Sequence, residues 1–283
     1  MQTQIINGRQ IRKEILEQIK KEIKNLSFQP VFCDVLVGDD PVSKQYIDMK
    51  AKMAESVGIH FHHAGFSKDI NTEDLIQEIK KLNKLENMCG LIVQLPLPDH
   101  IDKKRVLDTI DKEIDVDCLG EESSHVFYGG DIEIGYPAAL ACMIILDSID
   151  IDISDKKIIV VGQGELVGKP VTHLLSMKNL KINTINKSTE NKNELIKNAD
   201  VIISGMGAGK YITGDMIKEG AIIIDAGTSE SSGGIIGDVD TDSVLGIASY
   251  VSPVPGGVGP VTVGILLQNV LKVAINKEKS KNV

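Results

Sequence analysis

No pair of cysteines in this sequence has the spacing of a zinc site or a redox-active disulfide. The four cysteines are scattered along the chain as Cys33, Cys89, Cys118 and Cys142, and no C-x-x-C motif occurs. Such a pattern is typical of buried thiols in a reducing compartment. We therefore expect neither a disulfide framework nor a zinc site.

An excess of basic residues is also missing. The chain has 31 Lys and Arg residues against 40 Asp and Glu residues, a formal charge of −9. Binding to a phosphate backbone needs a local cationic surface, and no basic stripe is present. We therefore expect no nucleic-acid partner.

Targeting and membrane segments are not apparent either. The opening residues, MQTQIINGRQIRKEIL, contain no apolar segment followed by a small-residue cleavage site. We found no later apolar run approaching the roughly 20 residues needed to cross a bilayer. The sequence therefore predicts a soluble, cytoplasmic protein with no membrane partner.

What the sequence has instead is a regular alternation of short apolar runs and helical patterns. A length of 283 residues makes two domains the default. In the first half, helical patterns at residues 43–59 and 71–84 separate three predicted strands, PVFCDVLVG, GIHFHHAGF and CGLIVQLPLP. This order predicts right-handed crossovers and a parallel sheet, with ligands at the carboxyl ends of its strands.

The second half begins after an apolar linking helix at residues 138–149. Its strand KKIIVV leads into a glycine-rich turn, and further strands are predicted at KINTIN, ADVIISG, GAIIIDAG and IASYVSPVP, all parallel by pattern. The predicted fold class is α/β with two domains and an active site in the cleft between them. Residues 1–137, completed by a C-terminal helix at 262–283, form a catalytic domain with a parallel sheet, and residues 138–261 form a Rossmann-type nucleotide-binding domain.

The turn VVGQGELVGKP places Gly162, Gly164 and Gly168 between a strand and a helix. Glycines there let the backbone approach a pyrophosphate, which the N–H groups and dipole of the helix then stabilise. The spacing is one residue longer than the usual dinucleotide fingerprint. A tight turn without a ligand is therefore the alternative.

Tyr46 and Lys50 lie four residues apart in a predicted helix, so both side chains project from the same face. They could act together on one ligand. The alternative is a solvated surface lysine and a tyrosine packed at a domain edge, because surface lysines greatly outnumber catalytic ones.

Seven stretches, in order, resemble the bifunctional methylenetetrahydrofolate dehydrogenase/methenyltetrahydrofolate cyclohydrolases. They are VGDDPVSKQYIDMKAKMAESVGI, GLIVQLPLPDHID, DKEIDVD, VGKP, YITGDMIKEGAIIIDAG, GDVD and PVPGGVGPVTV. The resemblance implies an enzyme of one-carbon metabolism that oxidises methylenetetrahydrofolate with a nicotinamide cofactor and hydrolyses the methenyl product to formyltetrahydrofolate. It also implies tetrahydrofolate derivatives as ligands, a homodimer, and no metal, so His60, His62 and His63 are interpreted as a polar strand face.

The same resemblance implies the roles of four residues. Lys50 matches the lysine that assists attack of water on the methenyl carbon, and Tyr46 matches the tyrosine that stacks on the folate. Gln94 matches a residue that hydrogen-bonds this lysine. Asp117 matches the carboxylate that binds the pterin's amino and ring N–H groups, although a turn-capping aspartate is the alternative.

Further expected contacts follow from the matched motifs. For the substrate we expect contributions from the strand end and from the proline- and glycine-rich loop, namely Leu95, Pro96, Pro255, Gly256 and Gly257. For the cofactor we expect the glycine turn and two later loops, namely Gly162, Gln163, Gly164, Val167, Gly168, Lys187, Ser188 and Thr228. We predict NADP, with NAD possible, because no acidic residue follows KINTIN, where NAD sites normally place one.

Several positions depart from the family pattern. Cys118 replaces the glycine of DVDG, the stretch GYPAALA at residues 135–141 replaces a Pro-Cys-Thr-Pro-like segment, and Gln163-Gly164 replaces Arg-Ser. Thr228 stands where the family has isoleucine. These changes leave open a catalytically altered, monofunctional or silent folate- or nucleotide-binding homologue as the alternative function.

Overall fold

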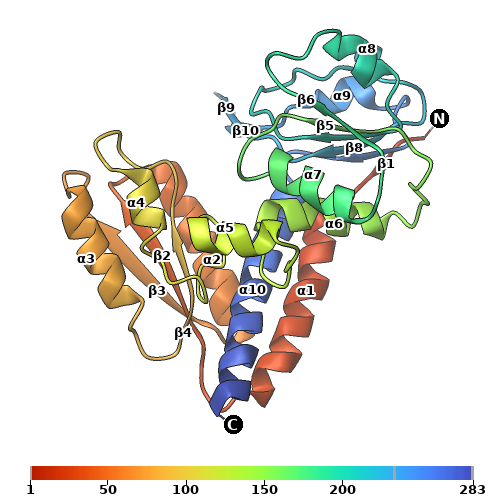
Figure 1. The fold of residues 1–283 in the computed structure, drawn as a ribbon. Helices are drawn as coiled ribbons and strands as arrows, with labels where there is room; N and C mark the ends of the chain where they lie inside the picture. Colours follow the sequence, from red (N-terminus) through yellow and green to blue (C-terminus); the bar gives the residue numbers. More distant parts are fainter. Residues whose placement is uncertain (1, 232–233, 282–283) are drawn as a thin grey trace. The chain divides into compact units, whose positions relative to one another are not determined.

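The chain is organised around two parallel sheets (Figure 1). The structure is a computed structural model that describes residues 2–231 and 234–281. One compact unit, here the Lys50 unit, comprises residues 14–135 and 266–283. The other, here the Gly162 unit, comprises residues 1–13 and 136–265. The α/β fold class with two parallel sheets is as the sequence predicts.

The sheet of the Lys50 unit has three parallel strands in the order β3-β2-β4. Its strands are β2 (Val31–Val37), β3 (His60–Phe66) and β4 (Met88–Val93). Between them run α2 (Pro41–Val57) and α3 (Thr72–Leu82). Both helices begin at side-chain caps, because Asp40 accepts a hydrogen bond from the Ser43 N–H and Asn71 accepts one from the Asp74 N–H.

Helices cover both faces of this sheet. Figure 1 shows α3 on one side and α2 with the later part of α10 (Val258–Lys281) on the other. Leu267, Val270 and Leu271 of α10 belong to the core of this unit. The packing is tight, since a β-carbon at Gly90 of β4 would lie 2.7 Å from Cγ2 of Val270.

Helix α10 begins four residues before the expected helix at 262–283, and residues 282 and 283 lie outside the described part. By length and composition it could also cross a membrane, with a mean hydropathy of 1.6 over its most apolar window. The sequence analysis did not anticipate this. However, 67% of that window is buried inside the protein, as expected for a core helix.

The sheet of the Gly162 unit has six parallel strands in the order β1-β11-β8-β7-β5-β6. They are β5 (Ile158–Val161), β6 (Ile182–Ile185), β7 (Val201–Ser204), β8 (Ile222–Asp225), β11 (Tyr250–Ser252) and β1 (Gln4–Ile5). Every strand pair in it is parallel, as expected.

Two features of this unit differ from the sequence prediction. Strand β1 was not predicted, because two residues are too few to show a periodic pattern. Its partner strand, β11, is also more than 240 residues away in the sequence. The sequence also did not predict β9 (Ser229–Ser231) and β10 (Gly234–Ile236), which pair antiparallel in a separate small sheet.

The remaining helices are mostly short. They are α1 (Gly8–Glu22), η1 (Ile23–Asn25), α4 (Lys103–Leu107), α5 (Glu121–Tyr128), α6 (Pro137–Ser148), α7 (Gly168–Met177), α8 (Lys192–Lys197), η2 (Gly214–Met216) and α9 (Thr241–Val244). Helix α6 is the linking helix expected at 138–149, shifted by one residue. Helices α4 and α5 shape the loop region described next.

Candidate active site

Lys50 is buried against the sheet of its unit. It lies on α2 one turn after Tyr46, and only 1% of its surface is exposed. Its Nζ lies 4.9 Å from the centroid of the Tyr46 ring, within the range of a cation–π contact. The surface-lysine alternative is therefore inconsistent with the structure.

Gln94 meets Lys50 from the end of β4. Its Oε1 accepts a hydrogen bond from Lys50 Nζ at 2.9 Å, and its Nε2 donates to the Leu95 carbonyl at 3.2 Å. Its backbone N–H donates to the Val35 carbonyl at 2.8 Å, which extends the pairing of β4 with β2. The amide group is thus held with its oxygen toward the lysine. Leu95 is half-buried, whereas Pro96 is exposed.

A third partner of Lys50 escaped the sequence analysis. Asp34, on β2, is fully buried, and its Oδ2 forms an ion pair with Lys50 Nζ. The other residues of β2 are apolar or cysteine. A charged residue in the middle of a buried strand is the signal that could have identified it, because burying a carboxylate is costly unless a partner is present.

Asp117 lies in the same electrostatic neighbourhood. Burial raises the pKa of its carboxyl to about 7, helped by the negative charge of Asp115 and opposed by the positive charge of Lys50. Burial also raises the pKa of Tyr46 to about 12, with the charges of Asp117 and Asp34 adding to the shift. The tyrosine therefore remains a neutral phenol at physiological pH.

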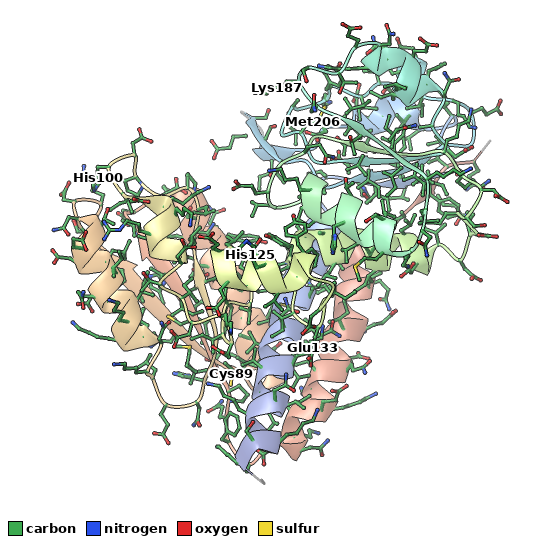
Figure 2. The ribbon with its side chains drawn as sticks, in the orientation of Figure 1. Cys89, His100, His125, Glu133, Lys187 and Met206 are labelled. Carbon is green, nitrogen blue, oxygen red and sulfur yellow. The ribbon has the colours of Figure 1, made fainter. Side chains whose placement is uncertain are left out.

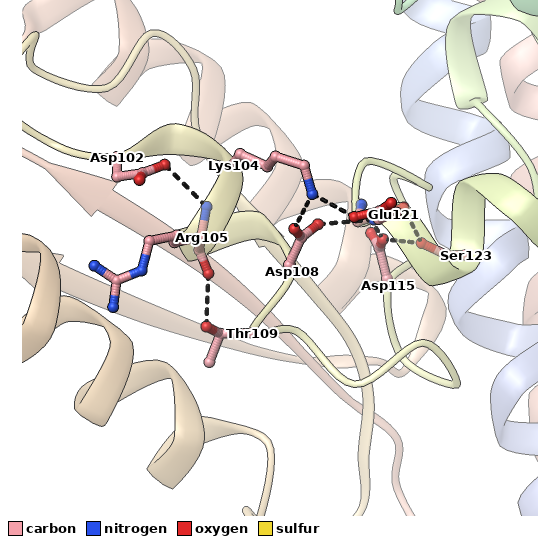
Figure 3. A network of polar contacts seen from close by, with 9 residues as sticks. Asp102, Lys104, Arg105, Asp108, Thr109, Asp115, Glu121 and Ser123 are labelled. Carbon is pink, nitrogen blue, oxygen red and sulfur yellow. Dashed lines mark hydrogen bonds and ion pairs between the residues drawn. The ribbon is translucent and has the colours of Figure 1, made fainter.

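The loop that carries Asp117 is fixed by buried hydrogen bonds (Figure 3). Oδ2 of Asp115 accepts hydrogen bonds from the Gly120 N–H, at 2.8 Å, and from the Ser123 hydroxyl. On the other side of the loop, Asn269 of α10 donates to the Val116 carbonyl at 3.0 Å. The backbone on both sides of Asp117 is therefore anchored, as expected of a residue that must present its carboxylate in one direction.

Cys118, next to Asp117, has a φ of +61°. Residues with a β-carbon rarely adopt this left-handed conformation, and glycine does so without strain. This backbone geometry explains why a glycine suits the position. The thiol of Cys118 is buried and donates to the Ser123 carbonyl at 3.4 Å, so the side chain is packed and hydrogen-bonded within the loop.

The glycine turn of the Gly162 unit is shaped mainly by its own backbone. Gly162 has a φ of +89°, and a β-carbon at Gly168 would lie 1.9 Å from the Gly162 carbonyl oxygen. A β-carbon at Gly164, in contrast, would meet no atom within 4 Å. The first and last glycines are required by the turn itself, while the middle one leaves open space where a ligand can approach.

Two side chains of this turn pack inward. Val167 lies beneath the turn, with its Cγ1 2.8 Å from where a β-carbon of Gly205 would be. Gln163 Nε2 donates to the Gly162 carbonyl at 3.0 Å and to the Thr172 hydroxyl at 3.3 Å. These hydrogen bonds hold the Gln163 side chain against the first turns of α7.

The other predicted cofactor residues follow the carboxyl ends of strands. Lys187 and Ser188 come after β6, and the label in Figure 2 marks Lys187 in the loop there, where its side chain is exposed. The Ser188 N–H and hydroxyl both donate to Oδ1 of Asn186, at 2.9 and 2.7 Å. Thr228 follows β8 and is exposed.

Two buried carboxylates hold the loops after β7 and β8. Asp238 accepts three hydrogen bonds at 2.7 Å, from the Ser204 hydroxyl and from the N–H groups of Met206 and Ala208. Asp225 accepts from the N–H groups of Gly227, Asp238 and Val239. The sequence analysis quoted these residues in its motifs without giving them a role.

The segment with Pro255, Gly256 and Gly257 packs closely on residue 8 of the same unit. Gly256 has a φ of +118°, and its carbonyl accepts a hydrogen bond from the Gly8 N–H at 3.0 Å. A β-carbon at Gly8 would lie 1.8 Å from the Gly257 carbonyl oxygen. Close packing within the chain is therefore one reason for the glycines here.

The structure places Lys50, Tyr46 and Gln94 together in the Lys50 unit. Asp117 is close enough to interact electrostatically with Lys50. The predicted cofactor residues all belong to the Gly162 unit. Among the described residues, no group of three or more His, Cys, Asp or Glu side chains is placed to hold a metal ion. His60 and His63 are exposed and His62 is half-buried on β3.

Comparison with known proteins divides the chain in a similar way. Residues 6–117 match the family described as tetrahydrofolate dehydrogenase/cyclohydrolase, catalytic domain. Residues 137–278 match its NAD(P)-binding domain. The bifunctional protein FolD of Hydrogenobaculum sp. is 40% identical over 270 residues, which cover 95% of this chain and 97% of that protein.

Solved structures agree. The bifunctional enzyme FolD, methylenetetrahydrofolate dehydrogenase/cyclohydrolase, from Campylobacter jejuni has a TM-score of 0.92 at 32% identity, covering 97% of this chain and 99% of that one. The Trypanosoma brucei methylenetetrahydrofolate dehydrogenase-cyclohydrolase, complexed with NADP and an inhibitor, has a TM-score of 0.92 at 30% identity, covering 98% and 99%. The resemblance noted in the sequence is thus confirmed, and the chain belongs to the tetrahydrofolate dehydrogenase/cyclohydrolase family.

Proposed function

We propose that this protein oxidises methylenetetrahydrofolate with NADP and then hydrolyses the methenyl product to formyltetrahydrofolate. The observation that carries the proposal is Lys50, which is buried beside Tyr46 and hydrogen-bonded to Gln94. These are the residues that the family motif assigns to catalysis. No feature of the structure favours a monofunctional or silent homologue.

Lys50 is the proton acceptor of the hydrolytic step. Water attacks the methenyl carbon, a C–O bond forms, and the electron pair of the C=N bond moves onto nitrogen. The water proton passes to the Lys50 amine, so that a neutral adduct and an ammonium group result. Gln94 keeps the amine in place, because its oxygen can only accept from it.

Tyr46, Leu95, Pro96 and Asp117 hold the folate. The Tyr46 ring offers a flat apolar face for stacking, and the Leu95 and Pro96 pair follows β4, where ligands of parallel sheets bind. The carboxylate of Asp117 accepts hydrogen bonds from the adjacent N–H donors of the pterin. Pro255, Gly256 and Gly257 add a stretch of backbone with little side chain to obstruct a ligand.

NADP binds at the glycine turn of the Gly162 unit. The open space at Gly164 and the start of α7 at Gly168 suit a pyrophosphate, with Gly162, Gln163 and Val167 shaping the turn. Lys187 and Ser188 contact the 2′-phosphate, and Thr228 borders the site after β8. When bound, the nicotinamide accepts a hydride. NADP is favoured over NAD because the loop after β6 has a cation where NAD sites place a carboxylate.

The Lys50 unit provides the folate-binding catalytic domain, and the Gly162 unit provides the nucleotide-binding domain. These units differ from the expected bounds mainly at the start of the chain, because residues 2–13, expected in the catalytic domain, belong to the Gly162 unit. The protein acts in the cytoplasm as a homodimer. Its partners are tetrahydrofolate derivatives, and it needs neither nucleic acid nor a membrane.

The test is to measure both activities on purified protein, as formation of reduced nicotinamide and as loss of methenyl absorbance. Lys50→Met should abolish methenyl hydrolysis while the protein remains folded. Lys50→Arg should fail too, because a guanidinium cannot act as a neutral base. Lys52→Met is the matched control, since Lys52 is an exposed lysine on the same helix. Unchanged hydrolysis in Lys50→Met contradicts the proposal.

A further inference from the structure

Asp34 is an acidic residue in the most apolar part of the Lys50 unit. It pairs in register with His63 of β3 and Ile92 of β4. Phe32, two residues earlier on β2, pairs with Gly90, whose open side faces Val270 of α10. Residues two apart on a strand share a face, so Asp34 points into the layer covered by α2 and α10.

The ion pair with Lys50 does not satisfy the whole carboxylate. Among the described residues, neither carboxylate oxygen of Asp34 has a hydrogen-bond partner, and Oδ2 contacts Lys50 Nζ only as an ion pair. A buried pair of this kind adds little stability over apolar residues of similar size. Stability alone is therefore a poor explanation for a carboxylate at this position.

The partners of Lys50 define the direction in which it can act. The lysine nitrogen has three positions besides its bond to carbon. Two of its contacts are with atoms that only accept hydrogen bonds, namely an ion pair with Oδ2 of Asp34 and a hydrogen bond to Oε1 of Gln94. These two contacts restrict where the lysine nitrogen lies.

We propose that Asp34 is a positioning residue for the cyclohydrolase reaction, which fixes the position of the Lys50 nitrogen and stabilises the ammonium group that forms when Lys50 takes the water proton. This rests on the proposed function, in which Lys50 is that proton acceptor. Asp34 resembles the aspartate of a Ser-His-Asp triad in its task, since that aspartate orients the base and stabilises its cation without contacting the substrate.

The charges around Asp34 are compatible with this role. Burial raises its pKa, while the charges of Lys50 and His63 and the hydrogen bond from Lys50 lower it. Tyr46 is neutral and lies on the same helix as Lys50. Asp117 is the remaining acidic group facing this pair, and it also interacts electrostatically with Lys50.

The two activities of the protein make the test specific. Oxidation by hydride transfer requires no proton acceptor, so it reports on the fold and on substrate binding. Asp34→Asn keeps the size of the side chain and removes its charge. We expect kcat of the cyclohydrolase to fall by at least tenfold, while kcat and KM of the dehydrogenase stay within about twofold of the wild type.

The pH profile provides a readout that a structural role does not move. In Asp34→Asn, no carboxylate stabilises the ammonium group, so the profile of cyclohydrolase kcat should change shape as well as height. Asp48→Asn is the matched control, because it makes the same change at an exposed carboxylate on the helix that carries Lys50. It should leave both activities and the profile unchanged.

Asp34→Glu covers the case in which the asparagine variant does not fold. It keeps the charge but displaces the carboxylate, and we expect a selective loss of cyclohydrolase activity smaller than that in Asp34→Asn. Unchanged cyclohydrolase activity in either folded variant overturns the proposal, and so does an equal fall of both activities at every pH. Failure of the proposed function is a different result, because Lys50→Met would then hydrolyse the methenyl substrate normally.

Discussion

The two units bury carboxylates in opposite ways. In the Lys50 unit, Asp34 is matched by one charged side chain, and neither of its oxygens has a hydrogen-bond partner among the described residues. In the Gly162 unit, Asp238 is matched by neutral donors, two backbone N–H groups and one hydroxyl, which use both of its oxygens. The second arrangement is fully satisfied and the first is not.

This difference fits a structural task for Asp238 and the task that we propose for Asp34. A carboxylate that accepts several backbone hydrogen bonds ties loops together. A carboxylate paired with a single lysine can instead stabilise the charge of that lysine. Asp225 shows the intermediate case, since burial raises its pKa to about 7 although three N–H groups donate to it.

The largest effect on stability should come from Asp238→Ala. It leaves the buried Ser204 hydroxyl and the part-buried N–H groups of Met206 and Ala208 without an acceptor. A buried donor without a partner costs about 1–3 kcal/mol, so we expect the free energy of unfolding to fall by roughly 3 kcal/mol. Denaturant unfolding measures this. Asp240→Ala is the control, because Asp240 is only half-buried and pairs with an exposed lysine, Lys210. If both variants unfold alike, Asp238 does not hold the loops.

A smaller and more local effect is expected for Asp117→Ala. Loss of one charge-assisted hydrogen bond is worth about 1.5–3 kcal/mol, which raises the folate dissociation constant about tenfold or more. NADP affinity should not change. Titration of each ligand separately measures this, and an unaltered folate affinity returns Asp117 to a turn-capping role.

The pH dependence of folate binding gives a second test of Asp117. Because the pKa of Asp117 is raised to about 7, the carboxylate that we propose binds the pterin is ionised above this pH and protonated below it. Folate affinity in the wild type should therefore weaken as the pH falls from 8 to 6, and Asp117→Ala should lose this dependence.

How far the sequence alone reached can be judged from these residues. Periodicity predicted the strands and the main helices, because apolar alternation reflects burial directly. The spacing of Tyr46 and Lys50 placed both on one helical face, and the contact between Lys50 and Gln94 followed from the family motif. Asp34 escaped, because its partner is 16 residues away and lies on another element.

Backbone conformation was less predictable than element type. The sequence singled out Cys118 as a departure, but only the structure gives it a left-handed φ. Likewise, nothing local to Gln4 and Ile5 indicates a strand, since β1 exists only by pairing with β11. Features that depend on contacts distant in sequence carry little signal in a single chain.

Cys118→Gly tests whether that backbone strain is real. Relief of a left-handed conformation favours glycine by about 1 kcal/mol, whereas the variant loses a buried thiol and gains chain entropy on unfolding. We expect the relief of backbone strain to offset the loss of the thiol and the added chain entropy, so that the free energy of unfolding changes by no more than about 1 kcal/mol. Cys89→Ala is a control for removing a buried thiol alone, since Cys89 lies on β4 and is not among the residues with a left-handed φ. If Cys118→Gly is as harmful as Cys89→Ala, no strain is being relieved.

The smallest effect should be that of Lys187→Ala on nucleotide choice. Lys187 is exposed, and contacts between exposed charges are worth at most about 1 kcal/mol, so the ratio of kcat/KM for NADP to that for NAD should fall only a fewfold. Gln163, the other residue near a 2′-phosphate in the family pattern, is bonded to Thr172 and the Gly162 carbonyl and offers no cation. Lys181→Ala is the control, because Lys181 is an exposed lysine at the opposite end of β6. A preference for NAD in the wild type, or an unchanged ratio in Lys187→Ala, would show that this loop does not recognise the phosphate.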